Sequence, residues 1–127
     1  MCFLTISQEL KEQLDDLGKE GERLLEQLKR RAFDASVSNI GLLDASDTNL
    51  RAPFPSDLRN AGVRKATIMR HRVYFTGQNT DCNYFAFYLK AFKRRDERAR
   101  DDNNPRFQNL VRKALDSPPV ETIEESK

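Results

Sequence analysis

The sequence has few of the residues that bind metals or nucleotides. Its 127 residues include one histidine, two cysteines and no tryptophan. A structural zinc site needs four nitrogen or sulfur ligands, which this chain cannot supply. The patterns GxxxxGK(S/T), GxGxxG and GxSxG do not occur, which excludes the common phosphate-binding loops and the nucleophile elbow. We therefore expect no metal and no small-molecule cofactor, and any chemistry must come from Arg, Lys, Tyr, carboxylates or the single histidine.

The two cysteines and the lack of long apolar runs indicate the compartment. Cys2 and Cys82 are far apart in the sequence, and neither belongs to a CxxC pair. We interpret them as two reduced thiols of a cytoplasmic protein. The chain contains no run of about 18 apolar residues, the length that a membrane span requires. Its first residues lack the basic region and small-residue cleavage site of a signal peptide. We expect neither secretion nor contact with a membrane.

The composition supports a core of modest size. Only 38% of the residues are hydrophobic, and 22 Lys and Arg residues nearly balance 20 Asp and Glu residues, for a net charge of +2. A chain of this length forms one domain of ordinary size, or a smaller domain with long appendages. The last stretch is acidic, contains proline and has almost no core-forming residues. We therefore predict a single domain over residues 1–115 and a disordered acidic tail over residues 116–127.

The N-terminal third predicts a short strand followed by helices. Met1–Ile6 is rich in β-formers, and Thr5 or Ser7 can cap the helix that follows. Gly18 and Gly21 interrupt the helical pattern, which predicts either a kink or two helices in an α-hairpin. The leucines that recur at helical spacing are Leu10, Leu14, Leu17, Leu24, Leu25 and Leu28. They form one apolar helix face, opposite a face of mixed charge.

The rest of the chain predicts strands and one more helix. Asp34–Asn60 has the composition of a connector with one further helical turn. Three β-rich stretches then follow: Val63–Met69, Arg70–Thr76 and Asn83–Phe92, of which the last two flank the turn residues Gly77–Asp81. Phe107–Leu115 has helical spacing, and Pro118 and Pro119 end it. The predicted fold class is α+β: an N-terminal helical hairpin packed on a small antiparallel β-meander, with a C-terminal helix.

Alternation along the predicted hairpin sorts its side chains onto two faces. The face expected to be polar carries Arg70, Arg72, Tyr74, Tyr84, Tyr88 and Lys90. The face expected to contact the leucine-bearing helices carries His71, Val73, Phe75, Phe85, Phe87, Leu89 and Ala91. By this pattern His71 is a core residue, while Arg, Lys and Tyr are displayed together on the other side of the sheet.

Charge is concentrated in the strand-forming region. Between Val63 and Arg100 there are ten basic and three acidic residues, a net charge of +7. Basic residues interleaved with tyrosines suit a polyanion, since cations neutralise phosphates and aromatic rings stack on unpaired bases. The alternative is that the arginines only shield a sheet face from solvent. The candidate RNA-binding residues are Arg64, Lys65, Arg70, Tyr74, Lys90 and Arg95.

Four segments, taken in order, resemble the RelE/ParE superfamily of bacterial toxins. Leu58–Arg64 resembles the leucine and glycine that enter the family's second strand. His71–Tyr74 resembles the third strand, Ala91–Arg95 the end of the last strand with its Lys and Arg, and Phe107–Leu115 the last helix. The resemblance covers about half of the chain, and the order and spacing of the segments carry it. It implies a RelE-like or HigB-like toxin of a type II toxin–antitoxin system.

The resemblance also implies an activity, its residues and its partners. Ribosome-dependent members of the family cleave messenger RNA without metal, through attack of the ribose 2′-hydroxyl on the adjacent phosphate. Arg72 matches the arginine that contacts this phosphate, and Lys93 and Arg94 match the basic pair after the last strand. The family's catalytic tyrosine has no counterpart in Lys93–Pro105. Tyr74 and Tyr88 are substitutes suggested by their sheet face, and Tyr88 is assigned the catalytic role. The implied partners are a cognate antitoxin, the ribosome and messenger RNA.

Other functions fit the same features. A ParE-like toxin would bind a protein target such as gyrase without cleaving RNA. A regulatory module would bind nucleic acid by the same basic face. A structural protein would use the leucine-bearing helices to dimerise. For the second-strand contact of the toxin hypothesis, either Arg64 or Lys65 fits.

Overall fold

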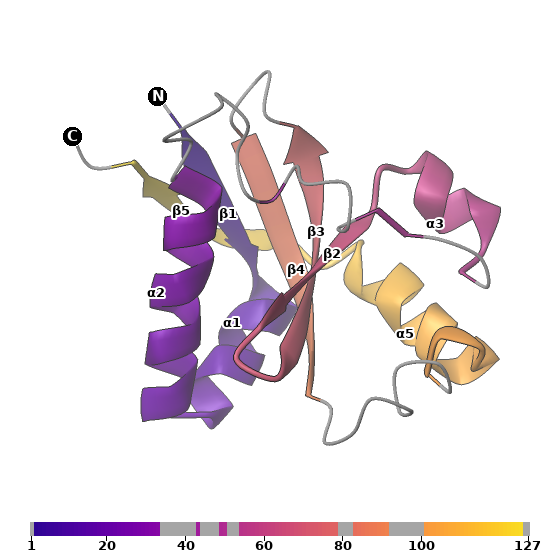
Figure 1. Cartoon of the computed structure of the whole chain (residues 1–127), viewed down its shortest axis with the longest axis horizontal. Coiled ribbons are helices and arrows are strands. Elements are labelled where there is room, and N and C mark those ends of the chain that lie inside the picture. Colours follow the sequence, from indigo (N-terminus) through magenta and orange to yellow (C-terminus); the bar gives the residue numbers. More distant parts are fainter. Residues whose placement is uncertain are drawn as a thin grey trace.

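The computed structural model describes residues 2–33, 43, 49–50, 54–78, 83–91 and 101–125. In the described residues, one strand is followed by three helices, three strands, a further helix and a last strand (Figure 1). The elements are β1 (Phe3–Ser7), α1 (Gln8–Asp16), α2 (Lys19–Phe33), α3 (Ser56–Asn60), β2 (Arg64–Ile68), β3 (His71–Gln78), β4 (Asn83–Ala91), α5 (Pro105–Ala114) and β5 (Pro119–Glu124).

The five strands form one mixed sheet in the order β2-β3-β4-β1-β5. The three-stranded antiparallel meander expected from the sequence is present as β2, β3 and β4. The N-terminal strand extends it by pairing parallel to β4, and β5 pairs antiparallel to β1. The fold therefore agrees with the α+β class, but the layout differs from the predicted one because two terminal strands join the sheet.

The N-terminal helices form the predicted hairpin. Ser7 caps α1 by accepting a hydrogen bond from the Leu10 amide, and its hydroxyl donates to the Phe87 carbonyl in β4. Gly18 follows α1 with a φ of +59°, a left-handed conformation that glycine adopts without strain. Both helices place leucines in the main hydrophobic core, against one face of the sheet (Figure 1).

The opposite face of the sheet is covered as well. Figure 1 shows α3 and α5 on the side away from α1 and α2. A second hydrophobic core lies there, and it consists of Leu50, Phe54, Leu58, Val63, Tyr74, Phe87, Tyr88, Phe107, Val111 and Ala114. The sequence predicted a polar face that displays its tyrosines. Instead, Tyr74 is completely buried, because the apolar side of α5 needs a surface against which to pack.

A β-bulge changes which side chains of β4 share a face. The register of β3 and β4 shifts between Tyr74 and Phe75, so that Tyr74 lies opposite Tyr88 and Phe75 lies opposite Ala86. Phe87 is the extra residue, and such an insertion interrupts simple alternation. The prediction was therefore right for Tyr88 and Leu89 but wrong for Tyr84, Phe85 and Phe87. Tyr84 belongs to the main core, whereas Phe85 and Phe87 pack with the second core.

The turn between β2 and β3 was not predicted. Met69 and Arg70 have φ values of 51° and 65°, the left-handed conformation of a two-residue hairpin turn. Such turns favour Asn-Gly, so the local sequence contained no turn signal. Arg70 consequently lies in the turn instead of beginning the third strand.

The C-terminal segment and Cys2 also differ from the predictions. Residues 116–127 were expected to be disordered, but Pro119–Glu124 form β5. The Thr122 hydroxyl lies 3.2 Å from that of Thr5, and the Glu125 amide donates to the Cys2 carbonyl. Cys2 is disulfide-bonded rather than a free thiol. The chain's only other cysteine, Cys82, lies outside the described residues.

None of the helices in the described ranges is long and apolar enough to cross a membrane.

Candidate functional site

The meander brings several of the candidate residues onto one face of the sheet. Lys65 on β2 lies opposite Tyr74 on β3, and Tyr74 lies opposite Tyr88 on β4. Arg72 lies opposite Lys90. Because residues directly opposite each other in an antiparallel pair point to the same side, all five share the face that α5 covers. Two cations and two phenols thus surround Arg72 and its strand.

Arg72 is buried, and one nitrogen of its guanidinium, Nη1, donates two hydrogen bonds. Its side chain is 4% exposed. Nη1 donates to Oδ1 of Asp102 at 2.6 Å and to the Tyr74 hydroxyl at 3.1 Å. Burial lowers the pKa of Arg72, but its interactions with Tyr74 and Asp102 more than offset this, so the net shift is upward. The guanidinium therefore remains a cation under all ordinary conditions.

Asp102 joins Arg72 to Lys65. Its second oxygen, Oδ2, lies 3.6 Å from Nζ of Lys65. Asp102 is only 15% exposed and lies just before Asn104, the residue that caps α5. The sequence contained no signal for this contact, because Asp102 is separated from Arg72 by 30 positions and belongs to a run of charged and polar residues. Asp102 is the principal site residue that the sequence-based prediction missed.

The two tyrosines belong to an aromatic cluster under α5. The Tyr74 ring centroid lies 6.2 Å from that of Tyr88 and 5.9 Å from that of Phe107. Burial raises the pKa of both tyrosine hydroxyls above the usual value of 10.0. Each phenol is therefore protonated at neutral pH, and it can donate a hydrogen bond but does not suit the role of a general base.

Lys90 lies at the rim of the same cluster. Its Nζ is 5.8 Å from the centroid of the Phe107 ring, which is cation–π range. Unlike Arg72, Lys90 is partly exposed. It therefore presents a positive charge beside α5 that remains accessible from solvent.

The other candidates lie elsewhere. Arg64 is opposite Phe75, and its guanidinium carbon lies 6.0 Å from the Phe75 ring, on the face of the main core. Arg70 is exposed in the turn between β2 and β3. The remaining three candidates, Lys93, Arg94 and Arg95, lie outside the described residues.

His71 is a core residue, as its position in the strand predicted. It is 5% exposed and lies opposite Ile68, which belongs to the main core. Its Nδ1 donates to the Met69 carbonyl at 2.9 Å. The described residues contain no group of three or more His, Cys, Asp or Glu side chains that could hold a metal ion.

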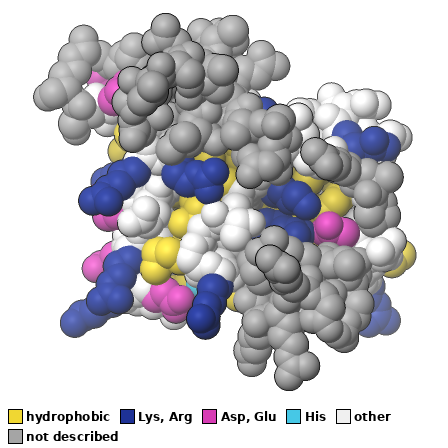
Figure 2. All heavy atoms as spheres, viewed as in Figure 1, with side chains coloured by type: hydrophobic (Ala, Val, Ile, Leu, Met, Phe, Trp, Pro, Cys, Tyr) yellow, Lys and Arg dark blue, Asp and Glu magenta, His cyan; other side chains and the backbone are white. Residues whose placement is uncertain are grey.

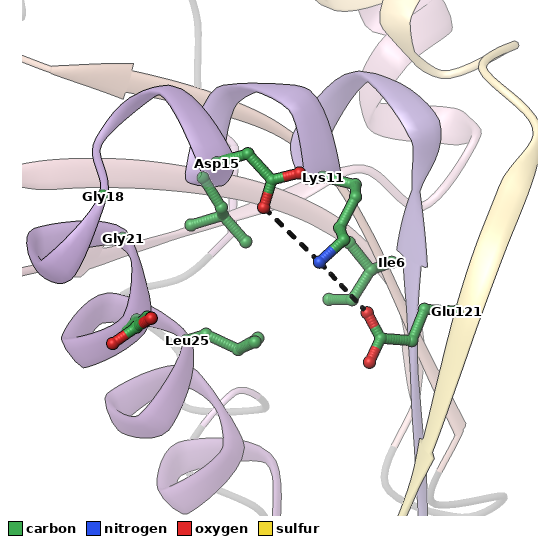
Figure 3. A pocket seen from close by; sticks show the side chains of 9 residues that line it. Ile6, Lys11, Asp15, Gly18, Gly21, Leu25 and Glu121 are labelled. Carbon is green, nitrogen blue, oxygen red and sulfur yellow. Dashed lines mark ion pairs between the residues drawn. The ribbon is translucent and has the colours of Figure 1, made fainter.

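A hollow on the far side of the sheet offers a different set of side chains. It has a volume of about 200 Å³ and lies among α1, α2 and β5. Figure 3 shows Lys11 between Asp15 and Glu121, with ion pairs of 3.4 Å and 3.9 Å. All three charged side chains are well exposed, so these ion pairs contribute little to stability. The residues that line the hollow include no Ser, Thr, Cys, Tyr or His side chain.

The charge on the face drawn in Figure 2 is mixed. On this face, Lys and Arg side chains of the described residues are spread out, with carboxylates and hydrophobic side chains between them (Figure 2). Of the basic and phenolic side chains on the sheet face that α5 covers, Arg72, Tyr74 and Tyr88 are buried, whereas Lys65 and Lys90 are partly exposed. Comparisons with family models, with curated proteins and with solved structures gave no match for the chain.

Proposed function

We propose that this chain is a ribosome-dependent, metal-independent endoribonuclease that cleaves messenger RNA, the toxin of a toxin–antitoxin pair similar to the RelE/ParE superfamily. The observation that supports this function best is the placement of Arg72, Lys65 and Tyr88 on one face of an antiparallel meander. The opposite face carries the helical hairpin of α1 and α2, which is compatible with the α+β class that the sequence resemblance implies.

The chemistry requires little more than charge and proton transfer. The 2′-hydroxyl of the ribose releases its proton to water and attacks the adjacent phosphorus. The bond to the 5′-oxygen breaks and this oxygen takes up a proton, so that a 2′,3′-cyclic phosphate and a 5′-hydroxyl result. Negative charge accumulates on the non-bridging oxygens during this step, and a fixed guanidinium stabilises it. Arg72 supplies this cation, and Lys65 adds a second charge to the same anion.

The tyrosines suit the donor side of the reaction. A phenol is a stronger acid than the alcohol that forms at the 5′-oxygen. A protonated tyrosine can therefore pass its proton to this oxygen as it departs. Tyr88 is closer to solvent than Tyr74 and is the better candidate for this role. Neither phenol suits the removal of the 2′-hydroxyl proton, because burial raises the pKa of both.

The partners follow from the same face. A cognate antitoxin would lay a helix or strand over the basic side chains and neutralise them. The ribosome would present the messenger RNA, and the protein would act in the cytoplasm. There, the disulfide bond of Cys2 would be exposed to reducing conditions.

Controlled expression in bacterial cells tests the proposal. Wild-type protein should arrest growth and produce new 5′ ends in translated messages. Arg72→Gln should abolish both effects while keeping the circular dichroism spectrum of a folded protein. Arg112→Gln is the matched control, since Arg112 is exposed and pairs with Asp57 away from the site. Normal growth and unchanged transcripts in cells that contain folded wild-type protein would overturn the proposal.

A second function is supported by the closed state of the site. Arg72 is buried and bound to Asp102. Of the described cations of the site, only Lys65 and Lys90 are partly exposed to solvent. A non-enzymatic toxin that binds a protein target such as gyrase needs no accessible Arg72, and the same is true of a regulatory module that binds nucleic acid through surface cations. Inhibition of gyrase supercoiling by purified protein that leaves ribosome-bound message intact would favour the gyrase-binding alternative.

A further inference from the structure

Asp102 holds Arg72 and Lys65 in the way that a phosphate group would. Each of its oxygens contacts a different cation: Oδ1 lies 2.6 Å from Nη1 of Arg72, and Oδ2 lies 3.6 Å from Nζ of Lys65. Two cations that converge on two oxygens of one anion form the arrangement by which proteins commonly bind phosphates. In this structure the anion belongs to the chain itself.

The guanidinium of Arg72 has donor capacity that Asp102 does not use. Its Nε is buried and has no hydrogen-bond partner among the described residues, although Arg72 is 4% exposed. Buried N–H groups without a partner are rare in proteins, because each costs the free energy of a lost hydrogen bond. A carboxylate offers two oxygens, whereas a phosphate or phosphodiester offers an additional one to a forked donor. The site is thus better matched to a tetrahedral anion than to its present occupant.

The net charge of the site is also compatible with a phosphodiester in place of the Asp102 carboxylate. One carboxylate opposes two cations, so the cluster of Lys65, Arg72 and Asp102 has a net charge of +1. Tyr74 is held neutral and adds a hydroxyl that already accepts from Arg72. If a phosphodiester replaced Asp102, the balance of charge in the buried site would be the same. The exchange would therefore leave no additional unpaired charge in the interior.

The side chain of Asp102 and the helix that follows it are held by different contacts. Beyond its two ion pairs, its backbone carbonyl accepts a 2.7 Å hydrogen bond from Gln108. By contrast, α5 is fixed by Phe107, Val111 and Ala114 in the second core. The hydrophobic contacts of α5 do not depend on Asp102, so the carboxylate can leave Arg72 while the helix stays in place.

We propose that Asp102 is an internal inhibitor: its carboxylate occupies the phosphate-binding site of Arg72 and Lys65 and must be displaced before an anionic substrate can bind. This inference rests on the proposed function for the identity of the anion as an RNA phosphate. It adds a regulated state to the site, because anything that draws Asp102 away activates the chain. A purely structural role for the ion pair is the alternative.

The test measures the binding of inorganic phosphate by calorimetry and by thermal shift. Asp102→Asn keeps the shape of the side chain and removes its charge, so it should bind phosphate about tenfold more tightly than wild type, the order of gain expected when a competing state is removed. Asp57→Asn is the matched control, since it removes the same charge from the exposed pair with Arg112. It should leave phosphate binding unchanged.

The result that overturns the proposal is equal phosphate affinity in wild type and Asp102→Asn. Should the variant be unfolded in phosphate-free buffer, its refolding is titrated with phosphate. Recovery of the native circular dichroism spectrum supports the proposal, and failure to recover at any concentration contradicts it. The double variant Asp102→Asn/Arg72→Gln should lose the gain.

These assays contain no RNA and no ribosome, so they are independent of the proposed function. Tighter phosphate binding by Asp102→Asn without any messenger cleavage would support the inhibitory carboxylate and contradict the nuclease. Messenger cleavage by wild type with no gain in phosphate affinity would support the nuclease and contradict the inhibitory carboxylate.

Discussion

Tyr74 and Tyr88 lie directly opposite each other on β3 and β4, with their ring centroids 6.2 Å apart. Both phenols are held in the neutral form by burial beneath α5, which raises their pKa values above 10.0. The pair joins the hydrophobic packing of the second core to the cation of Arg72, whose Nη1 donates to the Tyr74 hydroxyl. The stability of α5 on the sheet and the protonation of this cluster are therefore coupled.

The protein should lose stability at alkaline pH. Above pH 10.0, the usual pKa, the tyrosines of the unfolded chain release protons that the folded state still holds. The free energy of unfolding should fall by up to about 1.4 kcal/mol per pH unit for Tyr74, and by less for the more exposed Tyr88. Urea unfolding between pH 8 and about 11.5 measures this slope. Tyr74→Phe should have a shallower slope than wild type, and equal slopes would contradict the coupling.

Neighbouring basic residues of β2 should differ in their effect on anion binding. Lys65 shares the face of Arg72, whereas Arg64 lies over Phe75 on the other face. Lys65→Gln should weaken binding to an RNA oligonucleotide about three- to tenfold, the effect of one lost phosphate contact. Arg64→Gln removes the same charge from the adjacent position and should cause a smaller loss. Salt titration of both variants checks this, and a larger loss for Arg64→Gln would show that the register does not decide which residue binds.

Gly21 should not tolerate a side chain. A Cβ atom at this position would lie 2.0 Å from the Leu14 carbonyl oxygen, so α1 and α2 would have to separate. Gly21→Ala should therefore reduce the free energy of unfolding by about 3 kcal/mol, as overpacking against backbone does. Gly18→Ala is the control, because nothing lies within 4 Å of a Cβ atom added at this position. Only the left-handed φ of +59° would be strained for an alanine. It should cost about 1 kcal/mol, and denaturant unfolding compares the two.

The disulfide bond of Cys2 should contribute to stability. Cys2 adjoins β1, and its carbonyl accepts a hydrogen bond from Glu125 next to β5. Cys2→Ser should reduce the free energy of unfolding by about 2–4 kcal/mol, the usual effect of removing a native disulfide. Addition of a reducing agent should lower the Tm of the wild type to about that of Cys2→Ser, and it should leave the Tm of Cys2→Ser unchanged. A thiol assay that detects free cysteine in the untreated protein would contradict the bond.

Local patterns in the sequence were sufficient to predict several elements. The recurring leucines and the two glycines predicted the α1–α2 hairpin, because helical periodicity is a local property. The helix α5 was predicted from its helical spacing, and the strands β2, β3 and β4 were predicted from runs of β-forming residues, which are local properties as well. The face shared by Arg72, Tyr74, Tyr88 and Lys90 was also predicted correctly, since simple alternation holds for these four residues.

The errors have physical causes that local patterns do not contain. The bulge at Phe87 depends on how β4 fits β3, so it reversed the predicted sides of Tyr84 and Phe85. The acidic segment at the C-terminus has few apolar residues of its own, but it forms β5 because β1 offers an unpaired edge. A strand that is stabilised by backbone pairing with a distant segment does not need a hydrophobic pattern.

The sequence by itself determined the class of the fold, the helical hairpin and the row of basic and tyrosine residues on the meander, because periodicity and composition act over a few neighbouring residues. Only the tertiary structure decided that α5 covers this row and that Asp102 binds Arg72 and Lys65 within it. That contact joins residues 30 positions apart. Its strength comes from burial, which lowers the local dielectric and makes an unpaired Arg72 costly. Burial is a property of the folded chain, so the state of the candidate site could not be predicted from the spacing of its residues.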